Sequence, residues 1–563
     1  MPRLKSTAKL SVIITLLNEG EELNNTLKSL FKHTDPELLE VIVLDDASDD
    51  GYDYKAVCDL YSVVYVRNST RKGVALSRDI GVKMASCQYI MLLDAHMRFY
   101  QSDWLFRLLR HLEIDSNRLI CTQTVVLTKD EDNRIIQNEL DRSSYGAYIN
   151  FFELDRLFEP RWCFYKYQNI LSPTQLQKIE PHEIPLLCVL GATYSFSKVF
   201  WDKIGGLYGL REYGLDESYL SIKAWLSGII PVMVEDIYIG HIYRKKAPYD
   251  ISTQSQLYNS ILLALLFLPC SYIKGYLAVK SITNKSKVTS TLFEVYKIID
   301  WIKRERNTFL NKDEGKSIDQ IIAMNTQAFI TESGRLEETA QVEFITSRII
   351  YSYCDIKDFS LLSGRLGCIL YLLIYSAVKK DSIIYKIAET YAMQTTKTIL
   401  NAANTDEILL FEMGWFLVYT DTYRLLSIDL CSFIGYIDSV LSNVFIRGKL
   451  QTDEALRNAA ELYFECRLFI EDKINIAEEI REYMNHFSRK NNSIRTFFFN
   501  LFDIKDFIKV KPSLFDISYF YVPSPLDITQ YTLGLDGLAG IGIAELRFFE
   551  YETMGEYNKK QSL

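Results

Sequence analysis

The segment YIMLLDAHMRFY (residues 89–100) ends an apolar run with two side chains that can bind a metal, Asp94 and His96. Residues two apart on an extended segment point to the same side, so this carboxylate and this imidazole can reach one ion. Oxygen and nitrogen donors together suit a borderline divalent cation such as Mn²⁺, whose other positions phosphate oxygens and water can fill. Asp is also common where a strand meets a turn, so the pair alone is a weak signal.

Two later places supply further candidates for the same chemistry. The acidic pair Asp216 and Glu217 opens an amphipathic helix, where carboxylates also favour the helix dipole. His241 stands shortly before the cations Arg244, Lys245 and Lys246. A lone His is more often structural than a ligand, but a His beside three cations is well placed to complete a metal–pyrophosphate site.

The elements that must position these residues alternate between strand and helix. Continuous apolar runs predict strands over 9–18, 41–46, 63–68 and 89–96, and helical spacing predicts helices over 20–34, 54–61 and 74–85. This order is typical of a mostly parallel sheet with helices on both faces. Ligands bind such sheets at the carboxyl ends of the strands. Asp45, Asp46, Asp94 and His96 all fall there.

Composition limits the class of protein. The 563 residues predict two to four domains, and 48% apolar with 24% charged residues is a soluble globular balance. The net charge of −9 argues against a nucleic-acid binder. We expect no signal peptide, because the apolar run SVIITLL near the amino terminus is short and lacks a small-residue cleavage site. We expect no transmembrane segment either, because the run at 261–273 is too short and contains Pro. Ten scattered Cys without a CxxC pair indicate reduced thiols, hence a cytoplasmic protein.

From about Ser252 onward the pattern is helical. Two segments echo each other, LLSGRLGCILYLLIYSA (361–377) and LGLDGLAGIGIAELRFF (533–549), and each opens an apolar helix with a GxxG turn. Such repeats indicate an α/α toroid or solenoid. The sequence therefore predicts an α/β domain over 1–275, a helical linker region over 276–340 and an all-α, toroid-like domain over 341–563.

The first domain resembles the GT-A nucleotide-sugar fold of family-2-type glycosyltransferases, and most closely the catalytic domain of the polypeptide N-acetylgalactosaminyltransferases. The resemblance covers about residues 10–250, under half of the chain. It implies a UDP-sugar donor and Mn²⁺ (or Mg²⁺). The segments that carry it, in this order, are TLLNEG, PELLEVIVLDDASDD, RKGVALSRDIGVKMA, LLDAHMRF, FWDKIGG, WLSG and GHIYRKKAPY.

The resemblance also implies a role for each matching residue. Asp94, His96 and His241 would be the metal ligands. Asp45 or Asp46, with Leu16, would lie against uracil, and Arg78 would reach toward the phosphates or the uridine. The remaining implied residues are Arg244 and Tyr249 on a segment that closes over the diphosphate, Gly191, Ala192 and Thr193 beside the sugar, and the catalytic carboxylates Asp216 and Glu217.

The chain departs from that family at three points. Tyr213-Gly214-Leu215-Asp216-Glu217 stands where the family has Trp-Gly-Gly-Glu-Asn, and Ala247 replaces the basic residue expected before the Pro of the closing segment. A trefoil lectin repeat is not found. The sugar therefore stays open, as does the stereochemical outcome. Asp216 would be the general base of an inverting mechanism or a sugar- or acceptor-binding group in a retaining one.

The second half resembles the lanthionine-cyclase-like fold of peptide-modifying enzymes through its repeats. The zinc ligands of that fold include an adjacent Cys-His pair, which this half lacks. We therefore expect a non-catalytic toroid that binds a peptide, with a packing or dimerisation module as the alternative. The Cys and His residues concerned are Cys354, Cys368, Cys431, Cys466 and His486.

Together these features predict a bacterial-type cytoplasmic glycosyltransferase that modifies Ser, Thr or Cys of a ribosomally made peptide (RiPP maturation). One alternative is sugar transfer to a surface polysaccharide or a glycolipid. The non-enzymatic alternatives are a nucleotide-sugar-binding scaffold and a peptide-binding scaffold.

Overall fold

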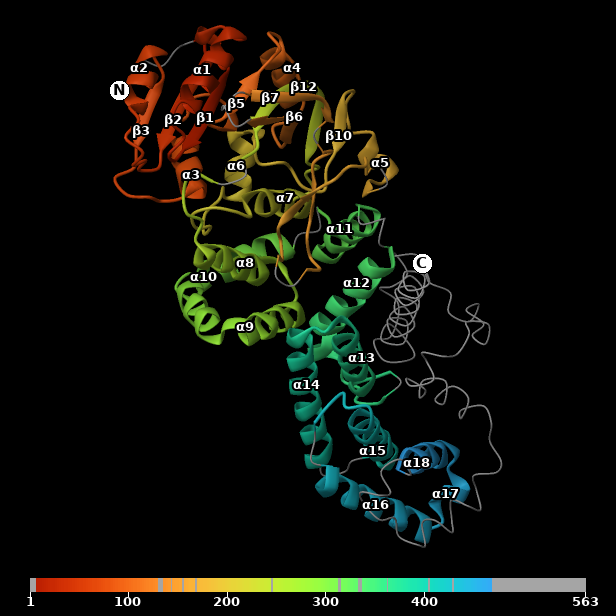
Figure 1. Cartoon of the computed structure of the whole chain (residues 1–563). Coiled ribbons are helices and arrows are strands. Elements are labelled where there is room, and N and C mark those ends of the chain that lie inside the picture. Colours follow the sequence, from red (N-terminus) through yellow and green to blue (C-terminus); the bar gives the residue numbers. More distant parts are fainter. Residues whose placement is uncertain are drawn as a thin grey trace, which may run out of the picture. The chain divides into compact units, whose positions relative to one another are not determined.

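The computed structural model describes residues 7–467 except 130–134, 143, 154–155, 168–169, 245–246, 312–314, 333–336, 362, 403–405 and 428–429. The chain divides into two compact units (Figure 1). Unit 1 is Met1–Cys270 with Lys285–Arg335, and unit 2 is Ser271–Asn284 with Leu336–Leu563. Helix α9 (Cys270–Tyr296) passes from one unit to the other, and its backbone is non-helical at Asn284, where the second crossing falls.

Unit 1 is built on a ten-stranded sheet with the order β10-β12-β6-β11-β4-β1-β2-β3, to which β5 and β7 add at β12 and β6. Its strands are β1 (Leu10–Leu16), β2 (Leu39–Asp45), β3 (Val64–Arg67), β4 (Tyr89–Asp94), β5 (Met97–Phe99), β6 (Leu119–Lys129), β7 (Ile135–Arg142), β10 (Glu183–Pro185), β11 (Thr193–Ser197) and β12 (Val232–Ile242). A separate hairpin pairs β8 (Ala147–Ile149) with β9 (Pro160–Trp162).

The helices of unit 1 are α1 (Glu22–Lys32), α2 (Tyr54–Leu60), α3 (Val74–Met84), α4 (Trp104–Leu112), α5 (Pro173–Leu176), α6 (Lys198–Ile204), α7 (Asp216–Leu226), α8 (Thr253–Phe267), the second part of α9, α10 (Ile299–Leu310) and α11 (Ile318–Glu332). The predicted alternation of strands and helices over residues 9–96 is confirmed. The parallel pairs β3-β2, β2-β1 and β1-β4 are confirmed with it. The sheet as a whole is mixed, because β11 runs antiparallel to both β4 and β6.

Helices cover both faces of the sheet, as expected of buried strands. Leu10, Val12, Ile14 and Leu16 of β1 share one apolar cluster with side chains of α1, α2 and α4. Ile13 points to the opposite face, because successive strand residues alternate. There α3 approaches so closely that a Cβ at Gly81 would lie 2.3 Å from Ile13 Cγ2.

Helix α10 is part of unit 1, although it falls in the segment predicted to be a linker. Lys223 of α7 is fully buried, and its Nζ donates to Glu305 Oε1 of α10 and to Ile204 O, both at 2.7 Å. Burial lowers the pKa of Lys223 to about 8, against the opposing effect of Glu305. The units thus divide at 270, 284 and 335, whereas the predicted boundaries are 275 and 340.

Unit 2 is helical over its described residues, which confirms the expected change from an α/β to an α-helical part. Its helices are the first part of α9, α12 (Glu337–Ser352), α13 (Arg365–Lys379), α14 (Ser382–Asn401), α15 (Glu407–Thr422), α16 (Leu430–Ile446), α17 (Lys449–Thr452) and α18 (Glu454–Arg467). Gly364 of the first echoed segment is the N-cap of α13. The second echoed segment and His486 lie outside the described residues, so the toroid stays a prediction. In the part of the chain that is described, no helix combines the length and the apolar character needed to cross a bilayer.

Candidate active site

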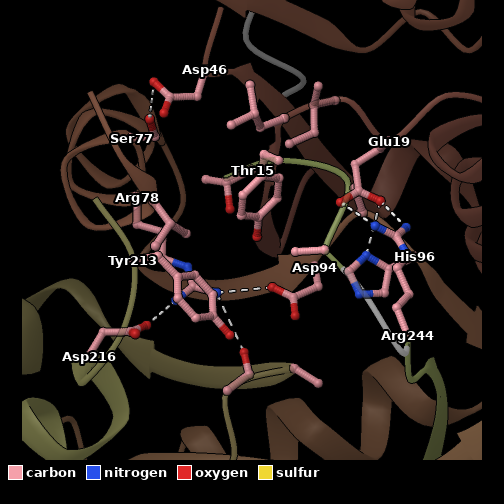
Figure 2. A pocket seen from close by; sticks show the side chains of 18 of the residues that line it. Thr15, Glu19, Asp46, Ser77, Arg78, Asp94, His96, Tyr213, Asp216 and Arg244 are labelled. Carbon is pink, nitrogen blue, oxygen red and sulfur yellow. Dashed lines mark hydrogen bonds and ion pairs between the residues drawn. The ribbon is translucent and has the colours of Figure 1, made fainter. Parts of the chain in front are cut away.

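A pocket of about 480 Å³ opens in unit 1 where β1, β2, β4 and β12 end (Figure 2). Parallel strands deliver their carboxyl ends to one edge of a sheet, which is where α/β proteins bind ligands. The structure brings nearly all of the predicted site residues to this pocket. Those that line it are Leu16, Asp46, Arg78, Asp94, His96, Gly191, Ala192, Asp216, Glu217, His241, Arg244 and Tyr249.

Asp94, His96 and His241 form the metal-binding candidate. Their ligand atoms all lie within 4.8 Å of one another. His96 Nε2 is 3.0 Å from His241 Nε2, and His241 Nε2 is 3.6 Å from Asp94 Oδ2. Adjacent ligands of an octahedral ion at about 2.1 Å from its centre are separated by about 3 Å. One carboxylate and two imidazoles at this spacing therefore fit one divalent cation.

Sequence reasoning missed Glu19, which holds two of the predicted residues in place. Glu19 Oε2 accepts from His96 Nδ1 at 3.1 Å, and Glu19 Oε1 accepts from Arg244 Nη1 at 3.2 Å. Arg244 Nη2 also donates to Glu19 Oε2 (Figure 2). The signal was available, because Glu19 belongs to the turn that follows the strand end in TLLNEG.

Burial and partners set the charge state of these groups. Burial by itself would raise the pKa of Asp94, but the hydrogen bond with His241 and the charge of Arg78 bring that pKa below its ordinary value. The pKa of Glu19 is likewise lowered, because His96 and Arg244 outweigh its burial. Burial lowers the pKa of His241 despite the opposing effect of Asp94. Both carboxyls are therefore ionised at neutral pH, and His241 is neutral, as a metal ligand must be.

Arg78 joins the metal-binding candidate to the carboxylates of α7. It is 4% exposed, and its Nη2 donates to Asp94 Oδ1 at 3.0 Å. Its Nη1 donates to the hydroxyl of Tyr194 at 2.7 Å and to Asp216 Oδ2. Tyr194 in turn donates to Asp216 Oδ2 at 2.9 Å. The guanidinium thus fixes two carboxylates that come from distant parts of the sequence.

The adjacent acids Asp45 and Asp46 differ in their position relative to the pocket. Asp45 does not line the pocket, and its carboxylate is occupied by Tyr65 (2.6 Å), Arg67 (2.6 Å) and the amide of Ser48 (2.8 Å). Asp46 lines the pocket, because successive side chains at a strand end point to opposite sides. The carboxylate of Asp46 is also hydrogen-bonded, to Asn68 Nδ2 (2.8 Å) and to the amides of Lys72 (2.8 Å) and Gly73 (2.7 Å). Of the two acids only Asp46 lines the pocket, and contact of either one with uracil stays a prediction.

The two acids at the start of α7, Asp216 and Glu217, also have different contacts. Asp216 is buried and held by Arg78 and Tyr194. Glu217 lies against Gly191, where an added Cβ would be only 1.9 Å from Glu217 Oε1. Burial, followed by the charge of Asp216, raises the pKa of Glu217 well above the usual range, although Arg78 opposes this. Burial and the neighbouring charge thus disfavour the ionised form of Glu217, which lines the pocket.

The turn that carries this pair is held by a side chain outside the predicted set. Leu215 precedes α7 with φ of 70°, a left-handed conformation that costs an ordinary residue roughly 1–2 kcal/mol. Asn259 of α8 is fully buried, and its Oδ1 accepts from the amide of Arg211 at 2.8 Å. Its Nδ2 donates to Arg211 O at 2.9 Å and to Gly214 O at 3.1 Å. No local sequence pattern links Asn259 to this turn.

Aromatic side chains also line the pocket, and apart from Tyr249 they were not among the predicted residues. Trp162 of β9 is 40% exposed and contacts Tyr243, with ring centroids 5.1 Å apart. Tyr213 is 44% exposed and lies 6.4 Å from Tyr249 between ring centroids. The high aromatic content was visible in the sequence, but which rings reach the pocket depends on the tertiary fold.

Part of the chain is similar in sequence to known glycosyltransferases. Residues 11–179 match the family model of glycosyl transferase family 2. Human polypeptide N-acetylgalactosaminyltransferase 14 is 28% identical over 246 residues, which are 42% of this chain and 41% of that protein. Human polypeptide N-acetylgalactosaminyltransferase 10 is 29% identical over 263 residues, or 44% and 40% of the two chains.

Among solved structures, a crystal structure of GalNAc-T7 with UDP, GalNAc and Mn²⁺ has a TM-score of 0.45 at 20% identity, covering 57% of this chain and 58% of that one. The match to the two human transferases spans about two fifths of their length. The matched residues include β1, β4 and the Asp94–His96 segment. The chain therefore contains, over residues 11–179, a glycosyl transferase family 2 domain.

Proposed function

We propose that the pocket of unit 1 transfers a sugar from a UDP-sugar to an acceptor with the help of a divalent cation, Mn²⁺ (or Mg²⁺). The observation that carries this proposal is the convergence of Asp94, His96, His241 and Arg244 on one pocket at the carboxyl edge of the sheet. A scaffold that only recognised a sugar would have no use for three metal ligands beside a cation that can bind phosphate.

Each residue then has a task set by its position. Asp94, His96 and His241 would hold the cation, which when bound supplies positive charge for a departing diphosphate. Arg244 would donate to the same diphosphate, since a guanidinium matches phosphate oxygens in a bidentate way. Leu16 and Asp46 would lie against the uracil, and Gly191 and Ala192 beside the sugar.

During transfer the bond from the anomeric carbon to the phosphate oxygen breaks, and a bond to the acceptor atom forms. The acceptor also loses a proton. We assign uptake of that proton to the α7 pair, and to Glu217 in particular, because Asp216 is already held by Arg78 and Tyr194. General-base assistance of this kind contributes typically 10²–10⁴-fold.

For the acceptor we propose a peptide hydroxyl, on Ser or Thr, or a Cys thiol. The matched human proteins are named as polypeptide transferases, and this supports a peptide over a glycan. The helical residues of unit 2 would then recognise that peptide. Transfer to a surface polysaccharide or a glycolipid is the alternative that an acceptor screen would reveal.

The test is thermal stabilisation of the whole chain by UDP and a panel of UDP-sugars, each with and without Mn²⁺. A ligand at about 100 times its Kd adds about 2.7 kcal/mol of stability by mass action. We expect a shift that requires both nucleotide and metal, largest for the true donor. Asp94→Asn should lose this shift, whereas Asp236→Asn, a partly buried acid paired with Arg107 outside the pocket, should keep it. Equal shifts in the wild type and Asp94→Asn would contradict the metal assignment, and no shift with any nucleotide would contradict the function.

A further inference from the structure

Glu19 stands at a fixed point between the metal-binding candidate and the segment that follows β12. The turn around it has left-handed residues on both sides, Asn18 at φ 56° and Gly20 at φ 54°. The amide of Asn18 donates to Ser48 Oγ at 3.0 Å, and the amide of Gly20 donates to the Tyr54 hydroxyl at 2.6 Å. The backbone that carries the carboxylate is therefore anchored on both sides.

This carboxylate determines which nitrogen of His96 can bind a metal. An ionised carboxylate only accepts hydrogen bonds, so His96 Nδ1, at 3.1 Å, must carry the hydrogen. The lone pair then lies on Nε2, which faces His241 Nε2 at 3.0 Å. That is the tautomer a metal ligand needs, and its orientation is held from behind, as is common for metal-bound imidazoles.

The same carboxylate holds Arg244. Both guanidinium Nη atoms donate to Glu19, one to each oxygen, which is the bidentate geometry of a strong ion pair. The Arg244 side chain is 22% exposed and Glu19 only 6%, so the cation is the more accessible member of the pair. Phosphate offers a guanidinium the same bidentate geometry as carboxylate.

We propose that Glu19 is a positioning residue that sets His96 for the divalent cation and holds Arg244 at the pocket until the diphosphate of a nucleotide takes the guanidinium over. The inference rests on the proposed function, from which it takes the cation and the nucleotide. It adds that metal binding and diphosphate capture are linked through one carboxylate, because His96 and Arg244 share Glu19 Oε2.

The energetic logic follows from the charges. A divalent cation beside Asp94, His96 and His241 repels Arg244, and the negative charge of Glu19 offsets this repulsion. When a diphosphate binds, its negative charge takes the place of the Glu19 charge beside Arg244. Arg244 can then leave Glu19 and pair with the diphosphate. Glu19 itself keeps its hydrogen bond to His96 throughout.

The experiment is a Mn²⁺ titration of the full-length protein without nucleotide, followed by the electron paramagnetic resonance signal of the free ion. Glu19→Gln should weaken Mn²⁺ binding by about 10- to 100-fold, the usual cost of losing the partner of a metal-bound imidazole. Glu22→Gln is the matched control, since Glu22 is a buried carboxylate three residues away that pairs with Arg98 and Lys129. It should bind Mn²⁺ like the wild type.

Arg244→Gln tests the other end of the contact. It should bind Mn²⁺ at least as tightly as the wild type, because a repelling charge is gone, and should bind UDP more weakly at saturating Mn²⁺. If Glu19→Gln does not fold, Glu19→Asp, which keeps the charge on a shorter side chain, should show a loss in the same direction.

The outcomes separate the two proposals. Wild-type affinity for Mn²⁺ in Glu19→Gln would overturn the role of Glu19 and leave the proposed function standing. Loss of Mn²⁺ binding in Arg244→Gln as large as in Glu19→Gln would overturn the assignment to His96. A wild-type protein that does not bind Mn²⁺ would overturn both proposals.

Discussion

Unit 1 contains the same three residue types, Glu, His and Arg, assembled twice. In the pocket, Glu19 binds His96 and Arg244. At the edge strand β10 of the same sheet, Glu183 accepts from His111 of α4 at 2.7 Å, and Arg118 donates to the same carboxylate. Both carboxyls have a pKa lowered by their partners in spite of burial.

The two clusters differ in what lies beyond the histidine. His96 presents Nε2 to His241 and Asp94 in an open pocket. His111 is 1% exposed, and its Nε2 is buried without a hydrogen-bond partner in the described structure. Residue type and pairwise distance therefore do not identify a functional site. Under the proposed function, the difference lies in converging ligand atoms with access to solvent, which the cluster around His96 has and the cluster around His111 lacks.

The largest effect that would sharpen this comparison is expected from Glu217→Gln. If Glu217 takes the acceptor proton, its loss should lower kcat by about 10²–10⁴-fold. Wild-type activity should rise with pH through the raised pKa of Glu217, because the base must be ionised, and the variant should lack this limb. The measurement is a pH–rate profile of sugar transfer.

Stability should move in the opposite direction in that variant. A carboxyl whose pKa is raised by folding stabilises least at high pH, since the folded state disfavours its charge. Glu217→Gln should thus unfold at a higher temperature than the wild type at pH 8, and at a similar one near pH 4. A fully active Glu217→Gln variant would contradict the role of Glu217 as the base. A variant that is less stable than the wild type at both pH values would show that Glu217 stabilises the fold.

Glu183→Gln should show the reverse pattern. Removing one member of a buried ion pair costs about 3–5 kcal/mol, because Arg118 is left in place without its counter-charge. The pKa of Glu183 is lowered in the folded state, so the loss should be largest at neutral pH and shrink as acid protonates the wild type. Urea unfolding measures it. Mn²⁺ affinity should not change, and a drop in affinity would break the distinction between the two clusters.

The smallest effect is expected from Asn259→Ala, with Asn325→Ala as its control. Both asparagines are fully buried and bond to backbone groups, Asn325 to the amide of Ile149 at 2.6 Å and to Ile321 O at 2.8 Å. Each variant should lose about 1–3 kcal/mol. Only Asn259→Ala should also lower kcat, by about 10-fold, because misplacement of reacting groups by about 1 Å costs up to about 10²-fold. Equal kcat values in the two variants would show that the Arg211–Gly214 turn does not position the α7 carboxyls.

Much of the fold of residues 9–96 was predictable, because apolar strand runs and helical spacing are local signals. Two of the three candidate metal ligands were predictable for the same reason, since Asp94 and His96 follow one another at a strand end, whereas His241 was expected from the family resemblance. The bridge from Arg78 to Asp94 and Asp216 was not, because it joins residues 138 apart in the sequence through side-chain geometry. Asp45 and Asp46 could not be separated either, since their orientation depends on where β2 ends.

The packing of α10 within unit 1 could not be predicted either. Its sequence IDWIKRERNTFL has an amphipathic pattern, which says that one face is covered but not what covers it. The covering groups include α7 and the loop before it, where Lys223 meets Glu305 and Tyr208 packs against Trp301 with ring centroids 4.9 Å apart. Helix α8 covers α10 as well, and its Leu265 O accepts from Arg306 Nη1 at 2.9 Å. Such pairs become visible only when the distant segments are placed together.

The Lys223–Glu305 pair has a practical consequence for anyone who wishes to separate the two halves of this protein. The α/β unit is discontinuous in the chain, since residues 285–335 return to it after 271–284 have joined the other unit. A fragment that stopped at 275, after the last strand and α8, would delete Glu305 and so remove the counter-charge of Lys223 in the last turn of α7, the helix that begins with Asp216 and Glu217. A cut at 335 keeps the pair intact, so expression and domain-exchange experiments should follow the connectivity of the helices and not the end of the sheet.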